Sequence, residues 1–241
     1  TQAEHYYQEG IDHKVRKSYI KLGLLYEKQA QFDLAKQYYE KFDLSNTATI
    51  GYQPSHNELA EGLFHLARWY DRESNTKKEL LDNAINYYKQ SSEYDYIPAK
   101  VNLGYIYDIG RGVPSNRQQA KKLYKEASKA GNMRATVNLA RLLEKKHPTK
   151  AIKIYQEAAA DGYQLGAFYY GCYLMSINQN KEAKVQFKKA SSIPAADVRL
   201  GMIYETERQY QAAFNKYYHW SLTTDTVPSN KSLILATYRL G

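Results

Sequence analysis

The amino-acid sequence predicts an all-α fold in which antiparallel helix hairpins repeat along the chain. Two recurring patterns of small and apolar residues, separated by turn residues, indicate this class. The length of 241 residues suits one continuous array of about six hairpins over residues 1–241. The chain contains 25 tyrosines and only 6 phenylalanines. Because tyrosine joins an apolar ring to a polar hydroxyl, this composition suits thin layers with much exposed surface.

The first pattern places a small residue, a leucine four positions later, and a second small residue directly after the leucine. We call the leucine position L and the predicted segment helix A. The copies start at Ser18, Gly62, Ala99, Ala135, Ala167, Ala196 and Ala236, and the copy at Ala167 is degenerate. Glycine inside a helix costs about 1 kcal/mol relative to alanine. We therefore expect the residue at L+1 to allow close approach of a neighbouring helix backbone, with Cys172 as one such small packing residue.

The second pattern, which we call helix B, places apolar residues three and four positions after an alanine, and a small or aromatic residue at seven. Its copies start at Ala35, Ala84, Ala120, Ala151, Ala183 and Ala213. These offsets fall on one face of an α-helix, so each helix A and helix B should pair and then stack on the next pair. Longer connections are expected at Asn46–Ser55 and Thr223–Ser229.

Both ends of the sequence are expected to interrupt a repeat. Residues Ala3, Tyr6, Tyr7 and Gly10 fit the helix B pattern with no helix A before them, and the last helix A stops at Gly241. Natural arrays end in capping helices with a polar outer face. We therefore expect a monomeric fragment of a longer array.

One segment has a specific resemblance to a known repeat family. Residues 99–131 read AKVNLGYIYDIGRGVPSNRQQAKKLYKEASKAG and resemble a Sel-1-like repeat, with Gly110, Gly112 and Val113 as its inter-helix loop. Glycine there turns the chain without a Cβ clash. The other units have shorter loops and resemble tetratricopeptide repeats. The resemblance implies a right-handed superhelical solenoid, with helix A lining a concave surface that binds peptides or proteins. It also implies a bacterial, virulence-associated protein of the enhanced-entry type or an envelope scaffold, located in the periplasm or secreted.

The sequence offers little chemistry for catalysis. None of the six histidines forms a zinc-type pair or an HExxH motif, and no phosphate loop or nucleophile elbow occurs. We predict no enzymatic activity, no cofactor and no metal. No apolar run approaches the roughly 20 residues that span a bilayer, so no transmembrane segment is expected.

A partner surface can be predicted from helix A. Residues at L−2, L−1 and L+2 should face the groove, where arginine can hold carboxylates and asparagine can pair with a peptide backbone. The candidates are Lys21, Phe64, His65, Arg68, Asn102, Tyr105, Asn138, Arg141, Tyr169, Tyr170, Tyr173, Arg199 and Met202. Aromatic residues and arginine are also the residues that dominate interface energetics.

We therefore expect a non-catalytic scaffold that binds a protein or peptide partner. An alternative is a factor for the assembly or regulation of envelope polysaccharide or peptidoglycan, where tyrosines would stack on sugars. A second alternative is RNA binding, given the net charge of +9. That charge is mostly interleaved with acids on the helices, and the repeated residues are packing motifs, so a nucleic-acid partner is not expected.

Overall fold

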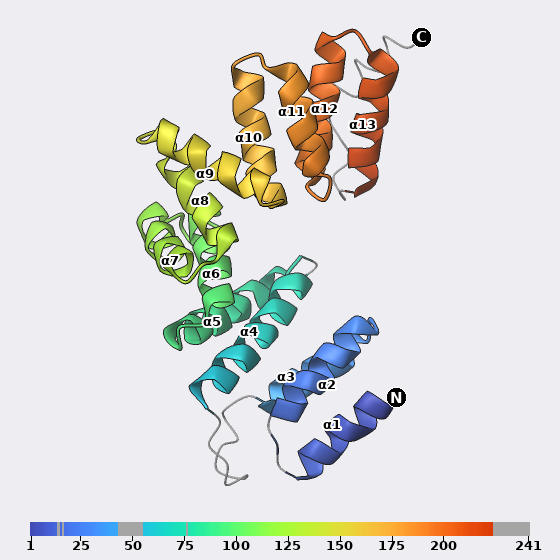
Figure 1. The fold of residues 1–241 in the computed structure, drawn as a ribbon. Coiled ribbons are helices and arrows are strands. Elements are labelled where there is room, and N and C mark those ends of the chain that lie inside the picture. The colour runs from blue at the N-terminus through green and yellow to red at the C-terminus, as the bar shows by residue number, and fades with distance from the viewer. Residues whose placement is uncertain (14, 16, 43–54, 76, 224–241) are drawn as a thin grey trace. The chain divides into compact units, whose positions relative to one another are not determined.

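The computed structural model describes residues 1–13, 15, 17–42, 55–75 and 77–223. These residues form α-helices, one short 3-10 helix and connecting turns, with no strand among them (Figure 1). The chain divides into two compact units, Thr1–Asn132 and Met133–Gly241. The expected helix A at Ala236 and most of the two expected long connections lie outside the described residues.

Where the structure describes it, the first unit contains one leading helix and three hairpins. Its helices are α1 (Gln2–Asp12), α2 (Lys17–Lys28), α3 (Phe32–Phe42), α4 (His56–Glu73), the 3-10 helix η2 (Lys78–Leu80), α5 (Leu81–Glu93), α6 (Ile97–Ile109) and α7 (Arg117–Lys129). Helix α1 packs against α2, and the Tyr26 hydroxyl donates a hydrogen bond to the Glu4 carboxylate. It therefore occupies the place that a helix B would take before the first hairpin.

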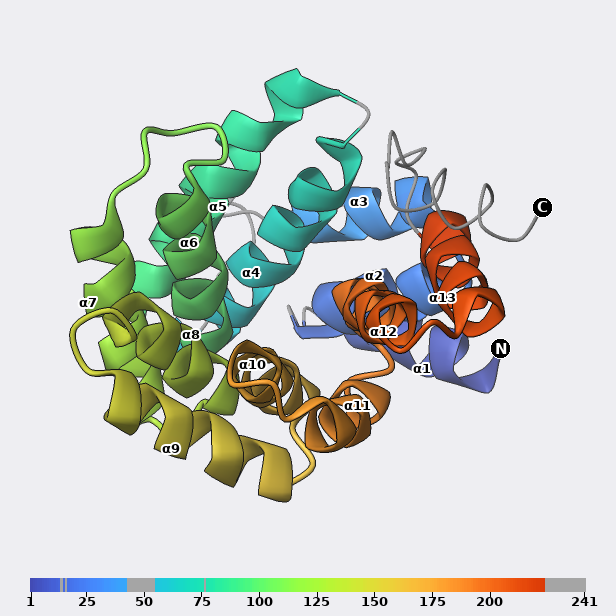
Figure 2. The same cartoon turned by 90° about the horizontal axis from the view of Figure 1, so that it is seen from above.

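The described part of the second unit, residues 133–223, contains three further hairpins. Its helices are α8 (Met133–Leu143), α9 (Pro148–Ala160), α10 (Gln164–Ser176), α11 (Asn180–Lys189), α12 (Pro194–Thr206) and α13 (Tyr210–Thr223). The two helices of a hairpin lie side by side, as α12 and α13 do (Figure 2). Every helix A and helix B predicted within the described residues is a helix, which confirms the all-α class and the stacked antiparallel hairpins.

Helix starts follow from local sequence. The Ser55 hydroxyl accepts the Glu58 backbone N–H, and the Glu58 carboxylate accepts the Ser55 backbone N–H at 3.0 Å. This reciprocal pair satisfies donors that the start of α4 would otherwise leave free. Pro98 and Pro194 lie in the first turns of α6 and α12, where a missing N–H costs nothing.

The predicted glycine loop between α6 and α7 is confirmed. Gly110 and Gly112 have φ angles of 74° and 72°, a region that residues with a Cβ rarely enter. A Cβ on Gly112 would lie 2.6 Å from Leu81 Cδ2, so the loop also packs closely on α5. Shorter hairpin turns use other residues in the same conformation, such as Asn178 at φ 61° and Arg208 at φ 59°.

Aromatic rings from helix B fill the space inside the hairpins. Tyrosines at the fourth position after the helix B alanine are at most 1% exposed, namely Tyr39, Tyr88, Tyr124, Tyr155 and Tyr217. A Cβ on Gly23 would lie 2.3 Å from Tyr39 Cε1, and a Cβ on Gly201 would lie 2.4 Å from Tyr217 Cε1. The expectation of backbone approach at L+1 was therefore wrong. The atoms closest to L+1 belong to the helix B tyrosine of the same hairpin, because its ring occupies the space between the two helices.

Four of these buried tyrosines place their hydroxyls on carboxylates at L+5 of helix A. The hydroxyl-to-carboxylate distances are 3.1 Å for Tyr39–Glu27, 3.2 Å for Tyr88–Asp71, 3.4 Å for Tyr155–Glu144 and 3.1 Å for Tyr217–Glu205. Burial first, and the carboxylate second, raises the pKa of each of these tyrosines. In the α10–α11 hairpin, Phe187 replaces the tyrosine and Ser176 replaces the acid. The hairpin that lacks the tyrosine hydroxyl therefore also lacks the carboxylate that would accept its hydrogen bond.

Candidate binding surface

The predicted residues at L−2 lie against the core. Phe64 is 9% exposed, and the equivalent Ile20, Val101 and Val137 are at most 2% exposed. Tyr169 is half-buried and its ring stacks on Tyr155 with centroids 5.2 Å apart. The L−2 position therefore supports the hairpins in both units and offers little surface to a partner.

The predicted residues at L−1 divide into buried and accessible ones. Asn138 and His65 are buried, at 5% and 8% exposed. Lys21, Asn102 and Tyr170 are half-buried, and Arg199 is exposed. Position L−1 therefore lies at the boundary between the packed and the accessible sides of helix A, and its exposure differs from one repeat to the next.

Among the predicted candidates, His65 has a clearly lowered pKa. Its ring stacks on Tyr39 with centroids 5.8 Å apart, and Phe64 approaches it edge-on at 5.4 Å. Burial, followed by the positive charges of Arg68 and Lys21, lowers the pKa of His65 to about 4. His65 is therefore neutral near pH 7 and acts as a packed aromatic residue.

The L+2 position is the most accessible of the three. Arg68 is exposed, and Tyr105 is 41% exposed. Arg141, Tyr173 and Met202 are half-buried. Every predicted candidate at L+2 thus presents surface, whereas those at L−2 are buried or half-buried.

In the first unit, accessible polar groups on helix A are held by defined contacts. The Arg68 guanidinium lies 5.9 Å from the centroid of the Phe64 ring. Asn102 Nδ2 donates to Tyr88 Oη at 3.1 Å, which fixes the orientation of its amide. Lys21 Nζ lies 3.7 Å from Glu61 Oε1 in a partly exposed ion pair. These contacts reduce the conformational freedom that binding would otherwise remove.

Arg111, in the glycine loop, is a residue that the sequence analysis treated only as part of a turn. It forms an ion pair with Asp71, and its Nη2 donates to Ser74 Oγ at 2.9 Å and Asn75 Oδ1 at 3.1 Å. The loop of the third hairpin is thereby tied to the end of α4. Two features of the sequence could have indicated this contact. One is an arginine between two loop glycines, and the other is an acid at L+5 of the preceding helix A.

In the second unit, the accessible helix A residues are aromatic, basic and thioether groups. Arg199 Nη1 lies 3.8 Å from Met202 Sδ, and Tyr170 stacks on Tyr173 with centroids 6.3 Å apart. Cys172 is half-buried beside them, and burial raises the pKa of its thiol although Arg199 opposes the shift. This agrees with a packing role for the cysteine.

The described residues contain neither a metal-binding cluster nor a membrane-spanning helix. No group of three or more His, Cys, Asp or Glu side chains in that part of the chain could hold a metal ion. None of the helices placed there is long and apolar enough to cross a membrane.

Family models match four segments of the chain. The Sel1 repeat model matches residues 60–93, 97–132 and 144–163. The tetratricopeptide repeat model matches residues 17–44. The second of the Sel1 segments contains the α6–α7 hairpin and its glycine loop. No curated protein sequence matches the chain.

Several solved structures have a similar fold. A protective antigen of uropathogenic Escherichia coli with an SLR fold is 21% identical, with a TM-score of 0.57 over 98% of this chain and 58% of that one. A Sel1 repeat protein from Oxalobacter formigenes is 19% identical, with a TM-score of 0.64 over 95% and 99% of the two chains. The APC/C hetero-tetramer Cut9–Hcn1 gives 12% identity and a TM-score of 0.69 over 100% and 46%. At these identities the likeness concerns the fold.

The chain spans little more than half of the Escherichia coli antigen and less than half of the matched Cut9–Hcn1 chain. Proteins built from Sel1 and tetratricopeptide repeats are generally protein-interaction scaffolds, and the fold is typically non-catalytic. The matched segments, the hairpin geometry and the similar structures agree with one another. The chain therefore contains segments that match Sel1 repeats and one that matches a tetratricopeptide repeat, in a fold of stacked helix hairpins.

Proposed function

We propose that this protein is a non-catalytic scaffold that binds a protein or peptide partner through the accessible L−1 and L+2 residues of helix A. One observation carries the proposal: the L+2 residues present surface and differ in chemistry between repeats, while the neighbouring L+1 residues are small throughout. A position that only supports the fold would repeat, as L+1 does. A surface that recognises one partner needs different groups along its length.

The accessible groups suit a protein partner. Arg68 and Tyr105 in the first unit, and Arg199 and Met202 in the second, combine cationic, aromatic and thioether surface. Arginine and aromatic residues are the commonest high-energy positions of protein interfaces. Part of the positive charge is already neutralised, since Lys21 pairs with Glu61 and Arg111 with Asp71. This distribution favours a mixed polar and apolar partner over a polyphosphate chain.

Affinity capture with matched variants tests the proposal. The wild-type protein, the Arg68→Ala/Tyr105→Ser variant and a Lys121→Ala/Lys125→Ala control would each be immobilised and exposed to extract of the source organism. Quantitative mass spectrometry should find proteins retained by wild type and control that the helix A variant loses. Equal retention by all three forms would refute the proposed surface, and retention of RNA in place of protein would refute the proposed partner class.

The concave shape expected for this surface, the monomeric state, and the bacterial, periplasmic or secreted setting stay predictions from the family resemblance. The absence of enzymatic activity belongs to the same proposal, because the Sel1 and tetratricopeptide fold is typically non-catalytic.

A further inference from the structure

A pair of accessible apolar residues, one tyrosine and one isoleucine, occurs on one helix A of each unit. In α6, Tyr105 lies at L+2 and Ile109 at L+6. Counted from Gly171, which takes the L position in the degenerate copy, Tyr173 and Ile177 occupy the same two positions at α10. Residues four positions apart lie on one face of a helix. Ile109 is 49% exposed and Ile177 is 43% exposed, so neither isoleucine belongs to the core.

The helix A that precedes each of these pairs has an arginine at L+2. Arg68 lies there in α4, ahead of α6, and Arg141 lies there in α8, ahead of α10. The L+2 residues therefore differ between neighbouring repeats but recur in alternate ones. Among the described helices A, α2 and α12 have Leu24 and Met202 at L+2, and neither has an apolar residue at L+6. The set of arginine, tyrosine and isoleucine thus occurs once in the described part of each unit.

In the first unit, the core brings the arginine helix and the tyrosine–isoleucine helix together. The Arg68 guanidinium lies 5.9 Å from the centroid of the Phe64 ring, and that ring lies 5.1 Å from the ring of Tyr96, the residue before α6. Arg68 is exposed and forms no ion pair with any residue that the structure describes, whereas Lys21 and Arg72 each form one. A guanidinium that is held in place and lacks an acid is suited to bind a carboxylate.

The second unit has an equivalent arrangement between α8 and α10. Ala140 of α8 shares a core cluster with Tyr155, and the ring of Tyr169 in α10 stacks on Tyr155 with centroids 5.2 Å apart. Arg141 directly follows Ala140 in α8, and Tyr173 lies four residues after Tyr169 in α10. Arg141 and Tyr173 are half-buried, so this set is less open than the first but keeps accessible surface.

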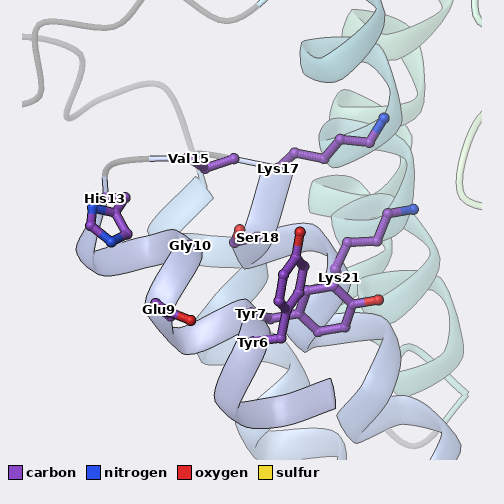
Figure 3. Close-up of a pocket in the computed structure, with 9 residues that line it drawn as sticks. All are labelled: Tyr6, Tyr7, Glu9, Gly10, His13, Val15, Lys17, Ser18 and Lys21. Atoms are coloured by element: carbon purple, nitrogen blue, oxygen red, sulfur yellow. The ribbon is translucent and has the colours of Figure 1, made fainter. Parts of the chain in front are cut away.

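The hollow between α1 and α2 belongs to neither set. Figure 3 shows its lining residues on α1, on the start of α2 and on the segment between these helices. Of the residues labelled there, Lys21 is the one predicted helix A candidate, and its Nζ lies 3.7 Å from Glu61 Oε1.

Packing does not require the two sets to be alike. Tyr105 is 41% exposed, Arg68 is exposed and both isoleucines are accessible. Positions of this kind tolerate most side chains with little effect on stability. Recurrence at such positions is therefore better explained by recognition of the same chemistry twice. Arginine complements a carboxylate, and the tyrosine–isoleucine pair complements an apolar side chain.

We propose that each unit carries one copy of the same binding site, formed by the arginine of one helix A and the tyrosine and isoleucine of the next. Each copy binds a short segment of a partner protein that presents a carboxylate to the arginine and an apolar side chain to the tyrosine–isoleucine pair. This inference rests on the proposed function and adds that the chain binds two such segments. The first copy consists of Arg68, Tyr105 and Ile109, and the second of Arg141, Tyr173 and Ile177.

Peptide selection followed by calorimetry on the full chain tests the inference. Random short peptides displayed on phage would be selected on the immobilised chain and depleted on its Arg68→Ala/Arg141→Ala variant. We expect the enriched peptides to share one acidic and one apolar residue. Isothermal titration of the wild-type chain with one such synthetic peptide should give a stoichiometry of two.

Single variants assign the two copies. Arg68→Ala and Tyr105→Ser should each leave one peptide bound per chain through loss of the first copy. Arg141→Ala should do the same through loss of the second, and Ile177→Ser repeats that test at a more exposed side chain. Arg117→Ala removes an exposed arginine of α7 and should leave the stoichiometry at two. Circular dichroism of each variant checks that the helices persist.

The inference is overturned if the enriched peptides lack the acidic and apolar residues, if the wild-type chain binds one peptide, or if Arg117→Ala removes a site as Arg68→Ala does. Failure of the proposed function gives a different result. If capture from extract depends on Arg68 and Tyr105 but the calorimetric stoichiometry is one, the scaffold function stands and the second copy is refuted. If capture does not depend on them, the helix A surface itself is refuted.

Discussion

Two adjacent positions of helix A behave in opposite ways. The L+1 residue is small in every described repeat, being Gly23, Ala67, Gly104, Ala140, Cys172 and Gly201. The L+2 residue one step along is partly or fully accessible and varies, being Leu24, Arg68, Tyr105, Arg141, Tyr173 and Met202. A step of one residue turns the helix by about 100°, from the packed face to the open one. The packed face therefore carries stability, and the open face is available for recognition.

Removing a buried helix B ring should have the largest effect on stability. Tyr88 is 0% exposed and its hydroxyl is bonded to Asp71. Tyr88→Ala should lower the free energy of unfolding by about 3–5 kcal/mol, because it leaves a cavity and removes one of the donors to the Asp71 carboxylate. Urea unfolding followed by circular dichroism measures this. A loss below about 1 kcal/mol would show that the packed face does not carry the stability assigned to it.

Acidification should destabilise the first unit through His65. Its pKa is about 4 in the folded chain and about 6.5 when unfolded, so the unfolded state binds more protons between these values. Stability should therefore be complete above pH 6.5 and fall as the pH drops towards 4, by roughly 3 kcal/mol in total. Urea midpoints across this range test the effect. His65→Phe should remove this component, and an unchanged pH profile in that variant would contradict the assignment.

The close approach at L+1 can be tested with two glycines. A Cβ would lie 2.3 Å from the Tyr39 ring at Gly23, but 2.8 Å from the Tyr124 ring at Gly104. Gly23→Ala should lower the unfolding free energy by about 2 kcal/mol, since overpacking exceeds the gain of about 1 kcal/mol in helix propensity. Gly104→Ala should cost less. Equal or stabilising effects in thermal melts of both variants would argue against the ring contact.

Changes on the open face should have the smallest effect on stability. Arg68→Ala and Tyr105→Ser remove accessible side chains, so each should change the unfolding free energy by less than about 0.5 kcal/mol. The same urea titrations measure this. A loss comparable to that of Tyr88→Ala would mean that L+2 supports the fold, and would end the distinction between the two faces.

The sequence was sufficient to predict the helices and hairpins, because their apolar periodicity reflects burial directly. It was not sufficient for the contacts inside a hairpin. The acids at L+5, such as Glu27 and Glu205, look like surface residues in a pattern of apolar positions, although they accept the hydroxyls of buried tyrosines. The joint change to Phe187 and Ser176 was the available signal for this pairing.

The candidate surface was predicted less completely. Positions L−2, L−1 and L+2 were treated as equivalent, but the structure buries Phe64, His65 and Asn138 while leaving Arg68 and Tyr105 accessible. The rotation of a helix about its own axis decides which of these positions faces solvent. That rotation depends on how the side chains of neighbouring helices pack together, which a periodic pattern does not specify.

Site-specific photo-crosslinking tests the scaffold proposal most directly. A benzophenone amino acid would replace Tyr105 on the open face of α6, or Lys121 on the exposed side of α7 as the matched control, in the full chain within source-organism extract. We predict a discrete protein adduct from position 105 that is absent from position 121 and is lost when Arg68→Ala is added. Equal adducts from both positions, or none from position 105, would contradict the proposal that helix A carries the binding surface.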